Sequence, residues 1–114
     1  MKYVILTYET ADDFDARRDG ERSEAYWRNW AVFGGALKAA GIVADMHGLQ
    51  NAETASTIRL RAGRKLVSAG PFMEGPIQLG GYFIIEAKDA AEAQDWAAKS
   101  PAAVNGAVEV RPVL

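Results

Sequence analysis

Two patterns of apolar residues occur along the chain, and each predicts a different kind of element. The segment 2–9, KYVILTYE, is a short, nearly continuous apolar run rich in β-branched and aromatic residues, which predicts a strand buried on both faces. Between residues 23 and 40 large apolar residues recur at helical spacing and share one face, namely Tyr26, Trp30, Phe33 and Leu37. This segment is therefore predicted to be an amphipathic helix, with Gly34 and Gly35 marking close backbone packing and Gly41 its end.

The segment between these two elements has a different character. Residues 10–22, TADDFDARRDGER, are dense in charges of both signs and show little periodicity. Such a stretch is typical of an exposed loop or a frayed helical lead-in. We expect it to contribute nothing to the core.

Strand patterns follow the helix. In residues 42–50, Ile42, Ala44 and Met46 alternate with Val43, Asp45 and His47, as the pleat of a strand requires. Residues 56–70 predict a hairpin that turns at Ala62-Gly63, with Ile58 and Leu60 inward and Arg59 and Arg61 outward. Residues 70–81 hold two prolines and several glycines, which indicates irregular backbone leading into a strand at 81–88.

The C-terminal segment predicts a short helix and a last strand. Asp89 and Glu92 have the spacing of a capping box, and Ala93, Trp96 and Ala97 then form the inner face of a helix that Pro101 ends. Residues 107–113, AVEVRPV, alternate as a strand with Val108 and Val110 on one face.

The order of these elements predicts an α+β fold. Strand, helix, strand, inserted β-hairpin, strand, helix and strand match the ferredoxin-like split βαβ plan, in one domain over residues 1–114. Two helices cover only one face of such a sheet. The other face, with Tyr82, Ile84, Glu109 and Arg111, needs a cover, which predicts a homodimer that stacks sheet on sheet.

Composition narrows the classes of partner. The net charge is −2 and the pI about 5.4, which gives no basic field for nucleic acid. There is no cysteine, so the protein itself forms neither a disulfide nor a thiolate metal site. No apolar run approaches the roughly 20 residues of a membrane span. We expect a cytoplasmic protein that binds neither nucleic acid nor membrane.

The C-terminal half contains a specific set of motifs: Gly70-Pro71-Phe72, Glu74, Gln78-Leu79-Gly80-Gly81-Tyr82, the acid-capped helix and Val108–Val113. In these motifs the chain resembles the YCII-related family, in the branch named after its DGPF motif. The N-terminal MKYVILTY and the segment around Gly48 also fit. The resemblance implies a dimeric α+β barrel, a superfamily that includes muconolactone isomerases and a chloro-hydroxyquinol dehydrochlorinase.

Two departures from the family pattern bear on function. Ala69 stands where the motif begins with aspartate, and Gly75-Pro76-Ile77 replaces a typical threonine, lysine and glutamate. The first helix also lacks the histidine of the histidine-aspartate pair of shorter members, so that pair is not carried over. Some family members serve alongside extracytoplasmic-function sigma factors, which keeps a non-enzymatic role open.

His47 and Asp45 are the leading candidates for acid–base chemistry. His47 is the only histidine, and the strand pattern places it on the same face as Asp45, whose carboxylate could orient the imidazole. The alternative is that both groups are solvated or support a subunit contact. With a single histidine and no cysteine, a structural zinc site is not expected.

Four further polar residues are candidates for ligand binding: Glu74, Gln78, Tyr82 and Arg111. Each has a structural alternative. Gly80-Gly81 could form only a bulge beside a solvated Glu74, Tyr82 could be a packed aromatic residue, and Arg111 could pair with Glu109 or Glu86.

Two hypotheses of function follow. The first is cofactor-free proton transfer, isomerisation or elimination on a small molecule in a cleft, as in an isomerase or lyase, with His47 as base and Asp45 as its orienting group. The second is a non-catalytic ligand-binding or regulatory protein, for which the missing aspartate and lysine of the motif argue. No phosphate-binding loop and no nucleophile elbow is present, so neither a nucleotide cofactor nor any other is expected.

Overall fold

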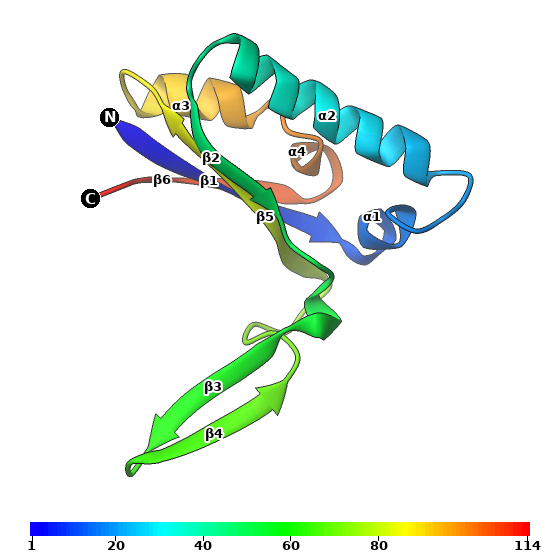
Figure 1. Ribbon diagram of the computed structural model, residues 1–114, viewed down its shortest axis with the longest axis vertical. Coiled ribbons are helices and arrows are strands. Elements are labelled where there is room, and N and C mark those ends of the chain that lie inside the picture. The colour runs from blue at the N-terminus through cyan, green and yellow to red at the C-terminus, as the bar shows by residue number, and fades with distance from the viewer.

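A computed structural model describes residues 1–114 and contains a four-stranded antiparallel sheet (Figure 1). Its strands are β1 (Lys2–Thr10), β2 (Val43–Gly48), β5 (Ile77–Glu86) and β6 (Ala107–Pro112), in the order β2-β5-β1-β6. Strands β5 and β6 both pair antiparallel with β1, and β2 pairs antiparallel with β5. This is the ferredoxin-like split βαβ arrangement, so the predicted α+β fold is confirmed.

The helices lie on one side of this sheet (Figure 1). They are α1 (Ala11–Ala16), α2 (Ser23–Ala39), α3 (Ala90–Ala97) and α4 (Ala102–Asn105), and a 3₁₀ turn, η1, spans Ala52–Thr54. The Asp89 side chain accepts a hydrogen bond from the Glu92 amide at 2.9 Å, which confirms the predicted cap of α3. None of the helices is both long and apolar enough to cross a bilayer.

The core lies between α2 and the centre of the sheet. Every second residue of β1, from Tyr3 to Glu9, points to the helices and is buried. Phe33 and Leu37 of α2 pack there, as the helical spacing predicted. The ring of Trp30 stacks on that of Phe83 with centroids 5.9 Å apart, which ties α2 to β5.

The charged segment after β1 differs from the expectation of an exposed loop. Residues 11–16 form α1, whose N-cap is Thr10, and the Thr10 hydroxyl accepts a hydrogen bond from the Asp13 amide at 3.1 Å. Phe14 is only 6% exposed. The helical alternative is thus the one observed, and the expectation that this segment contributes nothing to the core was wrong. A six-residue helix is too short to show a period, although its cap residue was visible in the sequence.

Strand β2 departs from strict alternation near its start. The register with β5 shifts between Val43 and Asp45, so Ala44 is a bulge residue. Val43 and Met46 therefore both pack against the core, whereas the alternation had placed them on opposite faces. From Asp45 onward the predicted faces are correct.

The predicted hairpin forms, but it makes a separate two-stranded sheet. Strands β3 (Ser56–Arg61) and β4 (Arg64–Ala69) join at Ala62 and Gly63, whose φ angles of 50° and 75° are those of a tight hairpin turn. Figure 1 shows the hairpin projecting away from the sheet and helices. Ile58 and Leu60 are 56% and 66% exposed, so their predicted inward orientation was wrong within one chain.

The second face of the main sheet has no helix over it (Figure 1). The register puts Val4, Leu6, Tyr82 and Ile84 on this open face, together with Glu109 and Arg111. It is the face for which the sequence predicted a cover. A second copy as that cover stays a prediction.

Candidate functional site

A buried ionic cluster lies where β1 ends against α2. Glu9 is on the helix-facing side of β1, and Arg17 directly follows α1. The Arg17 Nη2 donates to Glu9 Oε2 at 2.9 Å, with the two side chains only 9% and 2% exposed. Tyr26 of α2 completes the cluster, because its hydroxyl donates to Glu9 Oε1 and accepts from Arg17 Nε at 2.8 Å. Three separate elements are therefore held together by this cluster.

The guanidinium of Arg17 also binds backbone from two strands. Its Nη2 donates to the carbonyl of Gly80 at 3.1 Å, and its Nη1 donates to the carbonyl of Leu49, just after β2. The guanidinium carbon also lies 4.6 Å from the ring centroid of Phe14. All three nitrogens of the guanidinium are thus engaged within the protein, which indicates a fixed group rather than one free to hold a ligand.

Burial changes the acidity of the tyrosine in this cluster. Desolvation of the phenol, followed by its hydrogen bond to Glu9, raises the pKa of Tyr26 well above its ordinary value, and Arg17 opposes this only in part. Tyr26 is therefore a neutral donor at physiological pH. Its proton stays on the oxygen that faces Glu9.

Two glycines of β5 allow close contacts beside the cluster, and Gly80 makes room for the cluster itself. The register between β1 and β5 shifts after Thr7, which pairs with Gly81, so Gly80 occupies a bulge. A Cβ at Gly80 would fall on the Glu9 carboxylate, and one at Gly81 would come within 3.0 Å of the His47 carbonyl. The bulge that the sequence left as an alternative is present, and it also lets Glu9 and Arg17 meet.

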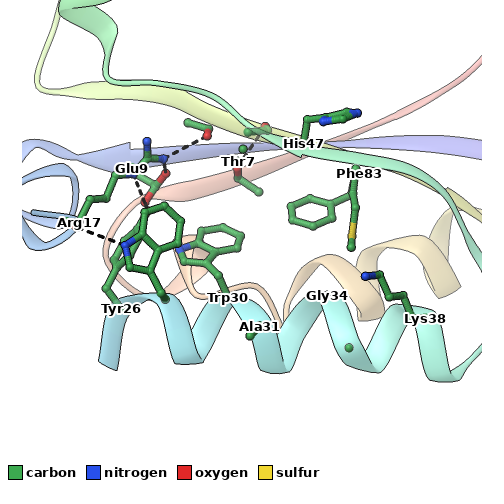
Figure 2. Close-up of a pocket in the computed structure, with 16 residues that line it drawn as sticks. Thr7, Glu9, Arg17, Tyr26, Trp30, Ala31, Gly34, Lys38, His47 and Phe83 are labelled. Carbon is green, nitrogen blue, oxygen red and sulfur yellow. Dashed lines mark hydrogen bonds and ion pairs between the residues drawn. The ribbon is translucent and has the colours of Figure 1, made fainter. Parts of the chain in front are cut away.

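A cavity of about 340 Å³ opens beside the cluster, between α2 and the strands β2 and β5 (Figure 2). Its walls are largely aromatic and aliphatic, with Trp27, Trp30, Met46 and Phe83, and glycines at positions 34, 35, 80 and 81 widen it. Glu9, Arg17 and Tyr26 line one end, and Lys38 stands at another part of the rim. This size and lining are within the range of small-molecule sites.

A second polar group lies on the open face of the sheet. Asp45 Oδ1 is 3.1 Å from His47 Nε2, and its Oδ2 accepts a hydrogen bond from the Tyr82 hydroxyl at 2.8 Å. His47 and Tyr82 are cross-strand partners, which explains how one carboxylate reaches both. That hydrogen bond raises the pKa of Tyr82 above its ordinary value.

His47 does not aim its imidazole into the cavity. His47 is among the residues that line the cavity, but Figure 2 shows its ring on the side of the sheet away from α2. The side chains of His47 and Asp45 are 65% and 47% exposed. No group of three or more His, Cys, Asp or Glu side chains is close enough to hold a metal ion.

Comparison with known proteins identifies the family of the chain. The model of the YCII-related domain matches residues 1–114. The chain belongs to the YCII-related family. The uncharacterised protein R00369 from Rhizobium meliloti (strain 1021) is 30% identical over 115 residues, covering 99% of this chain and 92% of the relative.

A solved structure has a similar fold. The 5-chloro-2-hydroxyhydroquinone dehydrochlorinase TftG of Burkholderia phenoliruptrix AC1100, in complex with 2,5-dihydroxybenzoquinone, matches with a TM-score of 0.52 and 18% sequence identity. The match covers 100% of this chain and 94% of that protein. At this identity the similarity establishes the shared fold.

In this YCII-related chain the remaining candidate residues are dispersed. The Gln78 amide donates to the carbonyls of Met73 and Gly75, at 2.9 and 3.0 Å, so it holds the loop before β5. Glu74 lies exposed in that loop. Arg111 pairs with Glu109 on β6, at the sheet edge opposite β2, while Glu86 pairs with the N-terminal amine. Of these residues, only Tyr82 joins His47 and Asp45.

The buried cluster of this YCII-related protein was missed by sequence reasoning. One signal was present, because Glu9 continues the inward positions of β1 after Tyr3, Ile5 and Thr7. A carboxylate on a buried strand face requires a cationic partner. The charged segment that follows supplies it as Arg17, but which of its three arginines does so depends on the path of α1.

Proposed function

We propose that the protein binds a small planar ring compound in the cavity between α2 and the sheet. The observation that carries this proposal is the cavity itself, about 340 Å³ in volume with aromatic walls and the fixed cluster of Glu9, Arg17 and Tyr26 at one end. A ring of one or two cycles fits such a volume. The flat faces of Trp27 and Trp30 provide surfaces on which it would stack.

The free polar groups of the cavity favour a ligand with acceptor atoms. Lys38 forms no ion pair within the chain, and Figure 2 shows its side chain extending from α2 toward the sheet. The indole Nε1 of Trp30 is buried without a hydrogen-bond partner. Glu9, in contrast, already accepts from Arg17 and Tyr26. A ring that carries an oxygen anion or carbonyl complements these donors.

The similar fold of TftG supports the choice of probe. That protein was solved with 2,5-dihydroxybenzoquinone, a planar ring that carries both carbonyl and hydroxyl oxygens. We take this compound as the first ligand to test.

Isothermal titration calorimetry of the full chain with 2,5-dihydroxybenzoquinone tests the binding site. Ala31→Trp places a bulky ring into the cavity from an exposed helix position, and we expect it to weaken binding by about tenfold or more. Ala25→Trp makes the same change on an exposed position of α2 outside the cavity and should leave affinity unchanged. No binding by the unaltered chain, or equal binding by the Ala31→Trp variant, contradicts the proposal.

A second candidate function is supported by the open-face group of Asp45, His47 and Tyr82. One carboxylate orients an imidazole at 3.1 Å and a phenol at 2.8 Å, an arrangement suited to moving a proton. The reaction would be cofactor-free proton transfer, isomerisation or elimination, with His47 as base. It requires a substrate on the open face, in a cleft that a second copy would close.

Chloride release from 5-chloro-2-hydroxyhydroquinone tests this candidate. Loss of hydrogen chloride takes a proton from a ring hydroxyl and chloride from the carbon that bears it, and it leaves a hydroxybenzoquinone, so the reaction needs no oxidant and can be followed by the chloride released. We expect His47→Ala to abolish release and the bell-shaped pH profile that an acid–base pair gives. Binding of the probe ring without turnover would instead favour a non-catalytic ligand-binding or regulatory role.

A further inference from the structure

Lys38 is the one charged residue of the cavity without a partner of opposite charge. With His47 counted as neutral, three of the sixteen residues that line the cavity are charged, namely Glu9, Arg17 and Lys38. Glu9 and Arg17 neutralise each other in their buried pair, whereas Lys38 forms no ion pair. The lining therefore has a net charge of +1, in a chain whose net charge is −2. This sign favours an anionic ligand.

The end of helix α2 does not require the Lys38 ammonium. A cation in the last turn of a helix can bind the free carbonyls at its C-terminus. In α2, backbone amides already donate to the carbonyls of Ala36, Leu37 and Lys38, at 3.0, 3.3 and 2.9 Å. Gly41, with a φ of 71°, lets the chain turn back to make these bonds. The side chain of Lys38 is thus left for another contact.

Gly34 leaves open the path from Lys38 to the cavity. A helical side chain leans over the residue one turn before it, which for Lys38 is Gly34. A Cβ at Gly34 would lie 3.5 Å from the Met46 sulfur, so only the absent side chain keeps this part of the cavity free. Figure 2 shows Lys38 extending from α2 toward the sheet. Because Lys38 is exposed, its ammonium stands at the mouth of the cavity and not in its depth.

The two ends of the cavity differ in the charge that they accept. At the end formed by the cluster, Arg17 and Tyr26 both donate to Glu9, so a ligand anion there would meet a carboxylate. At the Lys38 end, an anion would meet a free cation and remain close to water, so it would lose little hydration. The ring of Trp30, stacked on that of Phe83, lies between these ends and offers an apolar place for a ring.

We propose that the cavity selects a planar aromatic acid, whose anionic oxygen pairs with Lys38 at the mouth while its ring packs against Trp30. This inference rests on the proposed binding of a ring compound in the cavity, and it narrows the ligand from rings that carry oxygen to rings that carry a negative charge. Lys38 is then the residue that determines specificity. A neutral ring of the same shape still packs on the apolar walls but lacks the ion pair.

Two probes of the same shape and different charge test the inference. 2-Naphthoate has a carboxylate on two fused rings, and 2-naphthamide has a neutral amide in its place. In isothermal titration calorimetry of the full chain at neutral pH and low salt, we expect the naphthoate to bind about fivefold tighter or more. Ala31→Trp, which fills the cavity, should weaken the binding of both probes.

Variants of Lys38 assign the selection to its charge. Lys38→Met should weaken the binding of naphthoate about fivefold and leave that of naphthamide unchanged, because only the ion pair is lost. Lys38→Arg keeps the cation and should retain the preference for naphthoate. Lys65→Met is the matched control, because it removes the same charge from an exposed lysine of the hairpin outside the cavity. This control should leave the affinities for both probes unchanged.

The outcomes separate this inference from the proposed function. If naphthoate bound no tighter than naphthamide, or if Lys38→Met weakened both probes alike, the selection of an anion would be overturned while ring binding in the cavity stood. An equal effect of Lys65→Met would show that only the net charge of the chain matters, and it would overturn the role of Lys38. If neither probe bound, the inference would also fail. The proposed function would fail with it only if 2,5-dihydroxybenzoquinone did not bind either.

Discussion

Arg17 and Glu9 form a nearly fully buried ion pair, with Arg17 Nη2 2.9 Å from Glu9 Oε2. Glu9 comes from β1 and Arg17 from the turn that follows α1, and Tyr26 of α2 hydrogen-bonds to both. The pair is thus the contact that fixes the charged segment after β1 against the sheet. It also forms one end of the cavity.

Removing the cation of this pair should destabilise the chain, so that it unfolds at a lower concentration of denaturant. Arg17→Met leaves Glu9 buried without a counter-charge, and we expect the free energy of unfolding to fall by about 3–5 kcal/mol. The neighbouring Arg18 forms a surface pair with Glu53, with side chains 70% and 69% exposed. Arg18→Met should therefore cost about 0.5 kcal/mol or less. Urea unfolding measures the free energy of unfolding of the two variants. Equal losses of stability would show that the buried pair contributes no more to stability than the surface pair.

The sequence predicted this fold where the pattern is local. The helical spacing of apolar residues in α2, the cap at Asp89 and the turn at Ala62-Gly63 each depend on residues close in the chain. Helix α1 was not resolved from a loop because six residues show no period. The alternation gave the two faces of the hairpin correctly, but it does not say whether the rest of the chain packs on one of them, so the exposure of Ile58 and Leu60 was not predicted. In the candidate site, too, local patterns placed some residues correctly and long-range contacts placed the others.

Strand alternation placed Asp45 and His47 on one face, and the structure has them 3.1 Å apart. Tyr82 joins them through the pairing of β2 with β5, which joins residues more than thirty positions apart in the chain. Local patterns carry no information about that register. Predicting the cluster of Glu9, Arg17 and Tyr26 likewise requires the relative positions of three elements. The only sign of the cluster in the sequence is the carboxylate of Glu9 at an inward position of β1.

Alanine at two cavity glycines should have opposite effects on stability. At Gly80 a Cβ would collide with the Glu9 carboxylate and approach Arg17, so Gly80→Ala should lower the free energy of unfolding by about 1–3 kcal/mol. At Gly35, in the interior of α2, no atom lies within 4 Å of the new Cβ. Gly35→Ala should raise stability by about 0.4–1 kcal/mol through reduced backbone freedom of the unfolded chain. Thermal unfolding followed by circular dichroism distinguishes the two, and a stable Gly80→Ala variant would mean that Glu9 can relocate.

The raised pKa of Tyr26 in the buried cluster predicts that the stability of the chain depends on pH in the alkaline range. Burial and the hydrogen bond to Glu9 raise the pKa of Tyr26 in the folded state, while in the unfolded chain it ionises near its ordinary value of about 10. The stabilisation is fully present below pH 10 or so and is lost as pH rises further, because only the unfolded chain then gives up the proton.

Tyr26→Phe isolates this effect. The variant should lose about 1.5–3 kcal/mol at neutral pH, since Glu9 loses a hydrogen-bond donor. Above pH 10 the difference between the variant and the unaltered chain should shrink, by at most about 1.4 kcal/mol per pH unit and by less because the ring is only half buried. Urea unfolding across the alkaline range gives the two curves. Parallel curves would contradict the raised pKa.

The open-face group predicts a spectroscopic change that needs no substrate. The hydrogen bond from Tyr82 to Asp45, then desolvation of the phenol, and then the negative charge of that carboxylate make loss of the phenol proton harder and raise the pKa of Tyr82. Asp45→Ala removes the first and the third of these causes, so the phenol should titrate at lower pH than in the unaltered chain. Nuclear magnetic resonance of ring-labelled tyrosine follows Tyr82 directly, with Tyr82→Phe assigning its signal. His47→Ala is the matched control, because the imidazole makes no hydrogen bond to the phenol and its ring centroid lies 5.8 Å away. If His47→Ala moved the titration as far as Asp45→Ala, the histidine and not the carboxylate would set the acidity of Tyr82, and the assignment of Asp45 as the orienting group would be wrong.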